Sequence, residues 1–386
     1  MDLRGGARAP SRVVVKALHV ASCRGWSSDA YWAARVCREL DKAGHEATLV
    51  CKRGSENRVI ARARGEGVCR IETLALGSGV RPAGDLGDVR RLAALLERTD
   101  IVHVHRGKEH WLAALANRVG ARRKPLVRTR HIVQPLRAHP LNRWLYGQAT
   151  DLVVTVSEAI AKQCTAGGLA PRDRVVAMPG GADGEKFRPG LMGQELRRRL
   201  AVADGIPLIG LVSGFRVMKG QALVVEAATR LARQGRRFHI VFAGGGPFEG
   251  QIRSAVDAAG LRERVSFLGF VDDTGEVVGA LDIALYPPLE SDGMSRVLFE
   301  YLAAGRALVA SRVGAAAEVL TDGDDALLVP GGDVRELAGA MGRLLDDAPL
   351  RARLGLAAGK LAHARFTGAR VAERLLEHYH RLSARS

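Results

Sequence analysis

The sequence predicts an α/β protein that consists of two Rossmann-like, doubly wound domains. Short runs of β-branched and apolar residues alternate with longer amphipathic helical patterns along the whole chain, which is typical of parallel sheets built from βαβ units. The pattern restarts after the Phe-Arg-Pro-Gly of 187–190, and 386 residues are enough for two domains with separate cores. We expect an N-terminal domain over 1–190, a C-terminal domain over 191–365, and a last helix over about 366–386 that packs back onto the first domain.

The expected elements are short strands separated by helices. We expect strands over 12–20, 47–51, 101–105, 126–130, 152–156 and 175–178, and in the second half over 208–212, 238–242, 265–268, 283–286, 308–310 and 326–329. The clearest helix is predicted over 31–43 and ends at Gly44, because glycine readily adopts the left-handed backbone that follows a helix. In such folds ligands bind beyond the carboxyl ends of the strands, so the residues after each strand are the informative ones.

The charge of the chain is unevenly distributed. Residues 1–190 contain 33 Lys and Arg against 18 Asp and Glu, whereas residues 191–386 contain 25 against 23. Such an excess marks a surface that a polyanion could approach, either nucleic acid or an anionic membrane, although an Arg-rich coding bias explains the composition equally well. The composition, with 47% hydrophobic and 26% charged residues, is that of a globular protein, and no apolar run approaches the ~18 residues of a membrane span.

Two further features bear on the compartment in which the protein works. The basic residues 1–12 are interpreted as a loose arm before the first strand and not as a signal peptide. The five cysteines are odd in number and contain no C-x-x-C pair, which favours a reducing cytoplasm and gives no zinc motif.

The first informative loop is Ser-Gly-Phe-Arg-Val-Met-Lys-Gly over 213–220, between a predicted strand and a predicted helix. Gly214 permits close approach of a ligand, Arg216 can fork across two phosphate oxygens, and Lys219 adds a point charge at the positive end of the helix. The loop therefore indicates a diphosphate site. Taken alone, it is also typical of a strand-to-helix turn with solvated cations.

The segment 290–305 is the most specific pattern. Asp292, Arg296 and Glu300 recur every fourth residue before a helix cap at Gly305. If the segment is helical throughout, the two carboxylates stand about 12 Å apart, the reach from a ribose to a sugar across a diphosphate. A solvated helix face with an Asp near its start is the plainer alternative.

Two weaker signals accompany these motifs. The Ala-Gly-Gly-Gly-Pro of 243–247, which includes Gly246, suits close contact with a ligand or merely a tight turn, and it is not a dinucleotide fingerprint. His131 directly follows the predicted strand 126–130 and can hydrogen-bond a sugar hydroxyl or a phosphate oxygen, although a lone histidine is more often structural.

Taken together, these residues resemble the retaining glycosyltransferases of family 4, a group with the GT-B fold that includes lipopolysaccharide-core and phosphatidylinositol mannosyltransferases. The similarity covers nearly the whole chain, and its strength lies in the order of the motifs, which unrelated basic turns would not repeat. In chain order the motifs are Gly25, His131, Val156-Ser157-Glu158, Pro179-Gly180-Gly181-Ala182-Asp183 with Phe187, Gly214-x-Arg216-x-x-Lys219-Gly220, Phe267-Leu268-Gly269, Asp292-x7-Glu300 and Ala304-Gly305.

The resemblance implies two Rossmann-like domains that face a central cleft, and it implies roles for the motif residues. Arg216 and Lys219 would hold the donor diphosphate and stabilise the leaving nucleotide, Glu300 would bind the ribose, and Asp292 and His131 would act at the sugar. The other implied contacts are Gly214, Gly246, Gly293, Met294, Ser295 and Val297 for the donor, and Gly25 and Ser28 on the acceptor side.

Three positions depart from the family pattern. Asp292 stands where most members have Glu, one methylene longer, so the selection of the sugar is open to change. Gly180 replaces the usual Asn of Pro-Asn-Gly-Val-Asp, which weakens any role for that loop. The first loop, Gly25-Trp26-Ser27-Ser28, offers a single glycine.

The implied reaction is departure of the nucleoside diphosphate with attack by the acceptor on the same face, so that the anomeric configuration is retained. No side-chain nucleophile and no metal are implied, because preorganised positive charge stabilises the leaving phosphate. The only cofactor-like molecule expected is the nucleotide-diphosphate sugar, a co-substrate. The Asp-Gly-Asp of 322–324 matches a metal-binding D-x-D motif in letters only and is predicted to be a surface turn.

A basic segment in the first half predicts a membrane-facing surface. Seven cations and no acidic residue lie between 122 and 143, followed by an aromatic group that suits the headgroup region. The residues are Arg122, Arg123, Lys124, Arg128, Arg130, Arg137 and Arg143, followed by Trp144. We expect a peripheral enzyme on the cytoplasmic face of the membrane with a lipid-linked glycan acceptor; cations that flank a buried strand or bind a soluble acceptor are the alternative.

Three rival functions remain open at this point. A sugar-nucleotide epimerase of the same fold would leave the basic first half unexplained. A non-catalytic sugar-nucleotide binder is suggested by Asp292 but not by the intact Arg216, Lys219 and Glu300. A nucleic-acid partner is not expected, because the chain has no helix-turn-helix, zinc-finger or RNP-like motif and only 5% aromatic residues.

Overall fold

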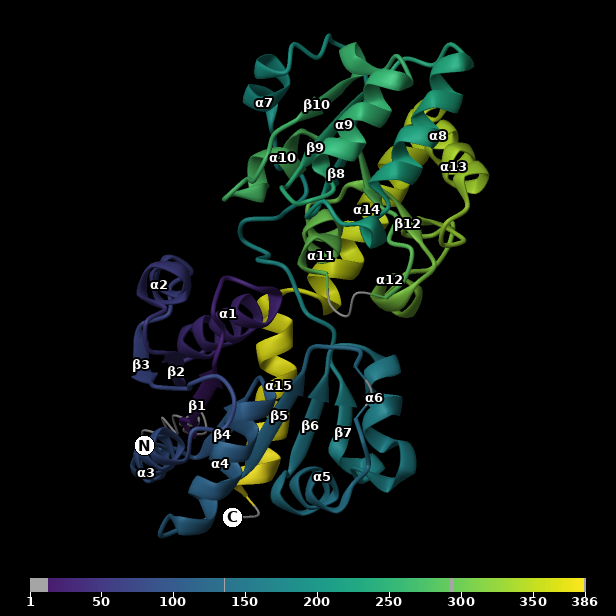
Figure 1. The fold of residues 1–386 in the computed structure, drawn as a ribbon. Coiled ribbons are helices and arrows are strands. Elements are labelled where there is room, and N and C mark those ends of the chain that lie inside the picture. Colours follow the sequence, from purple (N-terminus) through teal and green to yellow (C-terminus); the bar gives the residue numbers. More distant parts are fainter. Residues whose placement is uncertain (1–12, 135, 292–294, 385–386) are drawn as a thin grey trace, which may run out of the picture. The chain divides into compact units, whose positions relative to one another are not determined.

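The computed structural model describes residues 13–134, 136–291 and 295–384, and these form two β-sheets flanked by helices (Figure 1). The first sheet has seven strands in the order β3-β2-β1-β4-β5-β6-β7. Its strands are β1 (Lys16–Ala21), β2 (Glu46–Lys52), β3 (Arg70–Leu74), β4 (Ile101–Val104), β5 (Leu126–Arg130), β6 (Leu152–Thr155) and β7 (Val175–Ala177).

The second sheet has six strands in the order β10-β9-β8-β11-β12-β13 and is parallel throughout. Its strands are β8 (Leu208–Val212), β9 (His239–Ala243), β10 (Val265–Phe267), β11 (Ile283–Tyr286), β12 (Ala307–Ser311) and β13 (Leu327–Val329). In both sheets the strand order reverses once, between β1 and β4 and between β8 and β11. The prediction of two Rossmann-like sheets is confirmed.

All the strands expected from the sequence are present, and β3 is an additional one. Its sequence, Arg-Ile-Glu-Thr-Leu, lies at the edge of the sheet and only Leu74 is buried, so it lacks the apolar run that marks the other strands. The first strand starts at Lys16, four residues later than expected, because Val13 and Val14 are exposed.

Helices connect the strands. The helices of the first part are α1 (Ser28–Lys42), α2 (Ala61–Gly65), α3 (Pro82–Leu96), α4 (Gly107–Val119), α5 (Pro140–Trp144) and α6 (Glu158–Thr165). The later ones are α7 (Gln194–Arg199), α8 (Gln221–Arg233), α9 (Glu249–Ala258), α10 (Thr274–Ala280), α11 (Arg296–Ala303), α12 (Gly314–Val319), α13 (Val334–Asp346), α14 (Ala348–Arg365) and α15 (Gly368–Ser383). The predicted stop of the first helix is confirmed, since Gly44 follows α1 with a φ of 87°.

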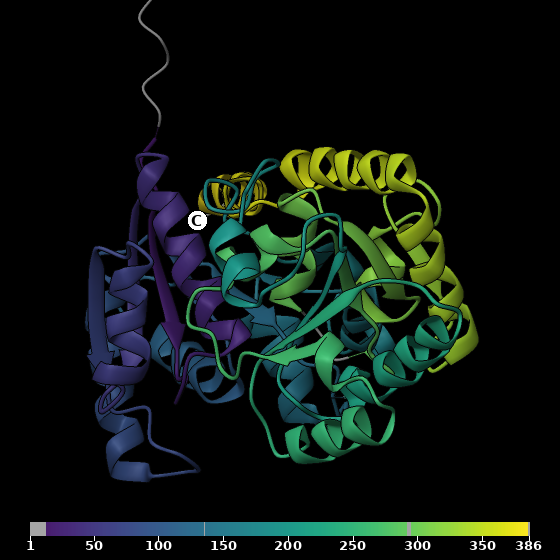
Figure 2. The same ribbon diagram turned by 90° about the horizontal axis from the view of Figure 1, so that it is seen from above.

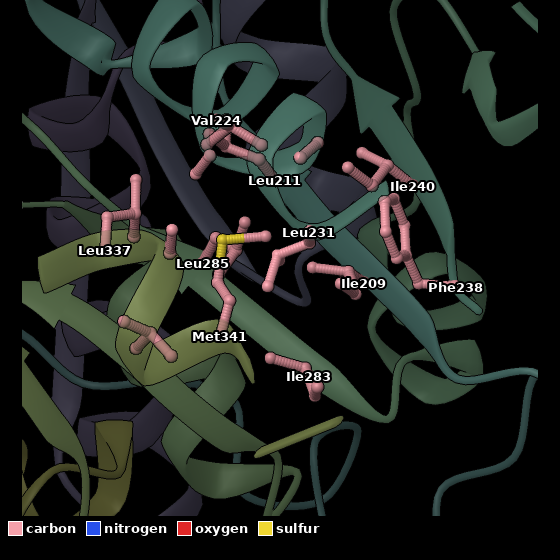
Figure 3. Packing of buried hydrophobic residues seen from close by; sticks show 14 of the residues in the cluster. Ile209, Leu211, Val224, Leu231, Phe238, Ile240, Ile283, Leu285, Leu337 and Met341 are labelled. Atoms are coloured by element: carbon pink, nitrogen blue, oxygen red, sulfur yellow. The ribbon is translucent and has the colours of Figure 1, made fainter. Parts of the chain in front are cut away.

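The core of the second sheet explains the positions of α8 and α13. Leu231 on α8 and Leu337 and Met341 on α13 point inward against Ile209 and Ile283 of the central strands (Figure 3). These side chains recur at helical spacing, so each helix presents one apolar stripe to the sheet and turns its polar face outward.

The chain contacts divide the protein into two compact units. One consists of Met1–Thr129, His139–Val153 and Arg374–Ser386, and the other of Arg130–Ala138 and Val154–Glu373. Most of the last helix belongs to the first unit and α14 to the second. Figure 2 shows the same elements from above.

The motif at 179–183 has a structural role within the second unit. A Cβ on Gly181 would lie 2.6 Å from the backbone carbon of Thr367, so only glycine allows this approach. The Ala182 amide donates to Phe366 O at 2.9 Å, and the Gly368 amide donates to Ala182 O at 2.8 Å. The motif therefore joins two segments that are far apart in the sequence.

A buried hydrogen-bond network ties α15 to the first sheet. The Tyr379 hydroxyl lies 2.5 Å from His103 Nδ1 and 3.2 Å from His19 Nε2, and His19 Nδ1 lies 3.1 Å from His105 Nε2. His103 Nε2 is also 2.5 Å from Thr129 Oγ1. All these side chains are buried. Burial lowers the pKa of His19 to about 3, so this imidazole is neutral in the folded protein near pH 7.

This network predicts a loss of stability at mildly acid pH. His19 in the unfolded chain takes up its proton near pH 6.5, whereas the folded protein resists protonation until about pH 3. The free energy of unfolding should therefore be fully present above pH 6.5 and fall below it, by about 1.4 kcal/mol per pH unit for this histidine. Urea unfolding of the native protein and of His19→Gln between pH 7.5 and 5.0 measures the effect. An equal pH slope in the two proteins would contradict it.

Candidate functional site

The loop that the sequence singled out lies at the carboxyl edge of the second sheet. After β8 ends at Val212, Arg216 has extended backbone, one 3-10 turn spans Val217–Lys219, and α8 begins at Gln221. The Arg216 side chain is exposed, and no hydrogen bond or ion pair from the described residues engages it, whereas Lys219 is half-buried. Two cations thus stand at the N-terminal, positive end of a 13-residue helix, which is the environment that a phosphate prefers.

The loop after β8 is fixed against the loop after β11. Gly220 has a φ of +79°, and a Cβ at this position would lie 2.0 Å from Pro287 O. The Leu289 amide donates to Met218 O at 2.9 Å. Because the two strands are neighbours at the reversal of strand order, their loops meet where the fold places ligands. Close backbone packing therefore positions the two cations.

The loop after β9 packs against the same segment from the other side. A Cβ on Gly246 would lie 2.5 Å from Phe215 O, and the Phe215 amide donates to Gly245 O at 3.1 Å. A Cβ on Gly214 would make only an ordinary contact, 3.5 Å from Gly245 O. The packing of the loops thus accounts for glycine at 246, and Gly214 keeps open space beside it.

Glu300 is buried on α11 and its carboxylate is held from two sides. Thr274 Oγ1 donates to Glu300 Oε2 at 2.9 Å, and Arg296 Nε lies 2.8 Å from Oε1. The Glu300 side chain is 2% exposed. A carboxylate is an acceptor with two oxygens, the kind of group that binds the vicinal hydroxyls of a ribose.

The helix expected from residue 292 begins at Arg296 instead. Ser295 occupies the N-cap position with extended backbone, so the spacing of about 12 Å expected for a continuous helix does not apply. Ser295 is buried and Val297 is half-buried at the start of α11. Asp292, Gly293 and Met294 lie outside the described residues, and their predicted roles stay predictions.

Two residues of this site were missed by the sequence argument. Besides Thr274, which orients Glu300, the buried Gln221 donates from Nε2 to Ser213 Oγ at 3.0 Å and to Gly214 O at 3.1 Å. Among the described residues nothing donates to Gln221 Oε1, and a buried acceptor of this kind is usually satisfied by water or ligand. Both residues are the first of a helix that follows a strand, a position that can be predicted from the sequence.

The predicted residues of the first half lie at carboxyl ends of strands in the first sheet. His131 follows β5 directly and is half-buried. Gly25, in the loop after β1, is half-buried with nothing within 4 Å of an added Cβ, and Ser28 is the exposed first residue of α1.

A buried carboxylate closes the loop after β1. Glu109, at the start of α4, accepts hydrogen bonds from the Ser22 amide at 3.0 Å and the Ser22 hydroxyl at 2.7 Å. Burial raises the pKa of Glu109. Arg106 Nε donates to Asp29 Oδ2 at 2.6 Å and joins the same two loops. The sequence analysis missed Glu109, because a glutamate in the first turn of a helix is ordinary.

The basic segment divides into buried and surface residues. Arg128 and Arg130 are buried within β5. For these two residues the alternative interpretation, cations that flank a buried strand, is the better one. Arg123 is exposed but pairs with Asp151 at 2.8 Å. The remaining cations are exposed or half-buried: Arg122, Lys124, Arg137 and Arg143. Trp144 is half-buried and stacks on Trp111 with ring centroids 5.8 Å apart.

Four further features of the described residues bear on a possible function: metal ligands, the Asp-Gly-Asp motif, a cavity and membrane spans. They contain no group of three or more His, Cys, Asp or Glu side chains that could hold a metal ion. The Asp-Gly-Asp of 322–324 forms the predicted turn, in which Asp322 pairs with Arg312. A cavity of about 810 Å³ lies at the opposite edge of the second sheet, near Asp282 and Arg306 before β11 and β12, and so away from the donor loop. No described helix is long and apolar enough to cross a membrane.

The comparisons with known proteins agree with this geometry. Residues 206–347 match the model of glycosyl transferases group 1, and residues 30–186 match that of glycosyltransferase family 4. A 2-deoxystreptamine glucosyltransferase of Streptomyces kanamyceticus is 32% identical over 278 residues, which cover 66% of this chain and 70% of that protein. The chain belongs to glycosyltransferase family 4. The resemblance drawn from the motifs is therefore confirmed, and the protein is a glycosyltransferase.

Two further matches support the assignment. A D-inositol 3-phosphate glycosyltransferase of Nocardia farcinica is 31% identical over 307 residues, 72% of this chain and 66% of that protein. The crystal structure of HepE of Anabaena in complex with UDP superimposes with a TM-score of 0.79 at 19% identity and covers 94% of this chain and 99% of that one, which supports the GT-B fold. The epimerase, the non-catalytic binder and the nucleic-acid binder are not favoured by these matches.

The exposed guanidinium at 216 gives a first prediction. We expect Arg216→Ala to lower kcat by about 10²-fold or more while the Kd of the donor rises much less, because the charge that Arg216 meets grows as the nucleotide leaves. Steady-state kinetics together with equilibrium binding of the nucleoside diphosphate separate the two effects. Arg237→Ala, which removes an exposed arginine of the same unit, is the control. Equal losses in kcat and in donor affinity would contradict the role.

The Glu300 carboxylate gives a second prediction. We expect Glu300→Gln to weaken binding of the free nucleoside diphosphate about 10-fold or more, because it loses a charge-assisted hydrogen bond to the ribose. Thr274→Val keeps the charge but releases one oxygen, so a smaller loss is expected. Calorimetric titration measures both, and thermal unfolding checks that the variants fold. Unchanged nucleotide affinity in Glu300→Gln would rule out the ribose contact.

Proposed function

We propose that this glycosyltransferase transfers a sugar from a nucleotide-diphosphate donor to a lipid-linked glycan acceptor at an anionic membrane surface, with retention of configuration and without a metal ion. The observation that carries the donor part is the loop of 213–220, which sets Arg216 and Lys219 at the positive end of α8. HepE, which shares the fold, was crystallised with UDP, and this supports a uridine or related nucleotide as the leaving group.

The chemistry requires that negative charge be stabilised as it develops. The bond between the anomeric carbon and the diphosphate breaks, and the nucleoside diphosphate keeps the electron pair. The acceptor oxygen bonds to the anomeric carbon on the same face and passes its proton to the departing phosphate. Arg216, Lys219 and the α8 amides supply the positive potential that a metal supplies elsewhere. Gln221 holds the loop and Glu300 fixes the nucleotide by its ribose.

The acceptor part rests on a surface of the first unit, the α4–α5 patch, defined as Arg118, Val119, Arg122, Leu141 and Arg143. Val119 is 67% exposed and Leu141 is 63% exposed, and the three arginines are exposed beside them. The two helices are joined because Trp111 stacks on Trp144 and Arg118 lies 5.1 Å from the centre of the Trp144 ring. Exposed apolar groups among cations suit an anionic leaflet. We propose peripheral attachment to the cytoplasmic face of the membrane.

A second acceptor class is favoured by one observation. The relative from Nocardia farcinica is a D-inositol 3-phosphate glycosyltransferase, a name that refers to a small phosphorylated cyclitol. The excess of cations in the first half would suit a soluble anionic acceptor equally well. The two classes differ in whether the α4–α5 patch is needed.

A transfer assay distinguishes the acceptor classes. Release of nucleoside diphosphate is measured in EDTA with UDP-, GDP- and ADP-sugars and either a membrane lipid extract in anionic vesicles or soluble inositol phosphate. We expect release of nucleoside diphosphate with the lipid acceptor. We also expect the protein to co-sediment with vesicles that contain phosphatidylglycerol but not with neutral ones. Salt should weaken this vesicle binding, because the Debye length shortens as the salt concentration rises. Abolition by EDTA with recovery in Mn²⁺ would contradict the metal-free mechanism, and transfer to the soluble acceptor alone would contradict the lipid acceptor.

A charge-matched pair of variants controls the vesicle arm. Arg122→Ser with Arg143→Ser removes two cations from the α4–α5 patch, and Arg90→Ser with Arg91→Ser removes two exposed cations from α3. Only the first pair should lose vesicle binding. Equal losses in both pairs would mean that the total charge of the unit, and not the patch, attracts the membrane.

A further inference from the structure

An arginine-lined cavity lies between α8 and α13, on the side of these helices away from the sheet. Its volume is about 470 Å³. Five arginines and a single acidic residue line it: Arg230, Arg233, Arg236, Arg335, Arg343 and Asp346. The sequence from residue 191 onward is nearly balanced in charge, with 25 Lys and Arg against 23 Asp and Glu. This cluster is therefore local and does not follow from the overall basicity of the chain.

Helical spacing places the arginines of each helix on one face of that helix. Arg335, Gly339 and Arg343 recur every fourth residue on α13 and so share one face. Arg230 and Arg233 lie one turn apart at the end of α8. The opposite faces of both helices are buried against the sheet by the apolar residues visible in Figure 3, so the arginines must face outward.

Small residues of α13 leave the space that the arginines surround. A Cβ added to Gly339 would meet nothing within 4 Å, so the position opens into the cavity. A Cβ added to Gly342 would lie 3.1 Å from Arg236 Cζ, so this glycine lets the Arg236 guanidinium lie against the helix. Gly339 thus lines the cavity directly, and Gly342 gives room to the Arg236 side chain that lines it.

Only one of the five arginines is neutralised. Arg236 Nε lies 3.1 Å from both carboxylate oxygens of Asp346, and Nη2 lies 2.6 Å from Oδ2. This pair lowers the pKa of Asp346. Across the described part of the chain, no hydrogen bond or ion pair engages the side chains of the other four arginines. Their mutual repulsion is uncompensated in the protein, and an anion with several charges would relieve it.

The lining chemistry identifies the kind of anion. All the cations are arginines, whose planar guanidinium groups bind phosphate oxygens in pairs, and the cavity volume lies within the usual range for small-molecule sites. None of the lining residues is a large exposed apolar side chain of the kind that enters a membrane. We propose that the α8–α13 cavity binds a small molecule that carries two or more phosphate groups.

This site is separate from the donor loop. The donor loop precedes the first residue of α8, and the cavity lies at the last turn of the same 13-residue helix, about 20 Å away at 1.5 Å per residue. A nucleoside diphosphate held at Arg216 therefore cannot reach Arg230 and Arg233. The proposal does not depend on the acceptor or on catalysis, because it concerns binding alone.

Calorimetric titration of the full-length protein with inorganic tripolyphosphate tests the proposal. The titration is done in an Arg216→Ala, Lys219→Ala background, so that the donor loop contributes no binding. We expect one tripolyphosphate per chain and much weaker binding of inorganic phosphate. Arg335→Ser with Arg343→Ser should weaken the binding of tripolyphosphate by about tenfold or more for each arginine. Absence of tripolyphosphate binding in the donor-loop background would overturn the proposal.

Two further variants exclude non-specific effects. Gly339→Glu places a negative charge in the open space and should abolish binding without lowering the melting temperature, since glycine inside a helix is itself unfavourable. Lys360→Ser removes an exposed cation of α14 outside the cavity and should leave the affinity unchanged. An equal loss in Lys360→Ser would overturn the site. The proposal would also be overturned if tripolyphosphate did not bind but binding of the protein to phosphatidylglycerol vesicles required Arg335 and Arg343. The cavity would then face a membrane.

Discussion

The adjacency of β8 and β11 at the reversal of strand order is the constraint on which the proposed donor site depends. Because the second sheet is parallel, the loops that follow these two strands emerge side by side. They approach so closely that residue 220 must be glycine, and this contact sets the start of α8 and with it the cations at 216 and 219. The loop after β9 adds a second backbone contact through Gly246. Positive charge is thus preorganised by backbone packing, to which the Gln221 side chain adds hydrogen bonds.

The same helix connects the donor loop to the arginine cavity. The inner face of α8 is fixed on the sheet by apolar contacts that Figure 3 shows, which leaves the two ends and the outer face available for charge. One end offers free amides to a diphosphate, and the other carries Arg230 and Arg233. A rigid element of this kind is expected to hold two anion sites apart, so that their charges interact weakly through solvent.

The two sheets use polar groups differently. The first sheet buries His19, His103 and Glu109 in hydrogen-bonded pairs, including the contact of Tyr379 that attaches α15. The core of the second sheet is apolar. Buried polar groups destabilise the fold unless each has a hydrogen-bond partner. The buried histidines of the first sheet therefore depend on the last helix of the chain, which supplies the Tyr379 hydroxyl.

The sequence by itself determined the fold class, nearly all the strands and the place of the 213–220 loop between a strand and a helix. Each of these has a local signal: an apolar run of strand length, a glycine after a helix, or cations directly after a strand. The edge strand β3 was not predicted, because four of its five residues are not buried. Asp292 was placed on a helix that begins only at Arg296, since a four-residue repeat does not reveal where a helix is capped.

Only the tertiary structure decided which charges are used internally. Arg128 and Arg130 belong to the same basic run as Arg122 but are buried in β5. Thr274 and Glu300 are 26 residues apart, on helices that follow two strands which are not neighbours in the sheet, and they meet only in the folded protein. The arginines of α8 and α13 are separated by about a hundred residues of sequence, and no local pattern brings them into one cavity. Burial and long-range pairing depend on how the helices and strands pack together. This packing results from many weak contacts along the whole chain, and no local sequence pattern shows it.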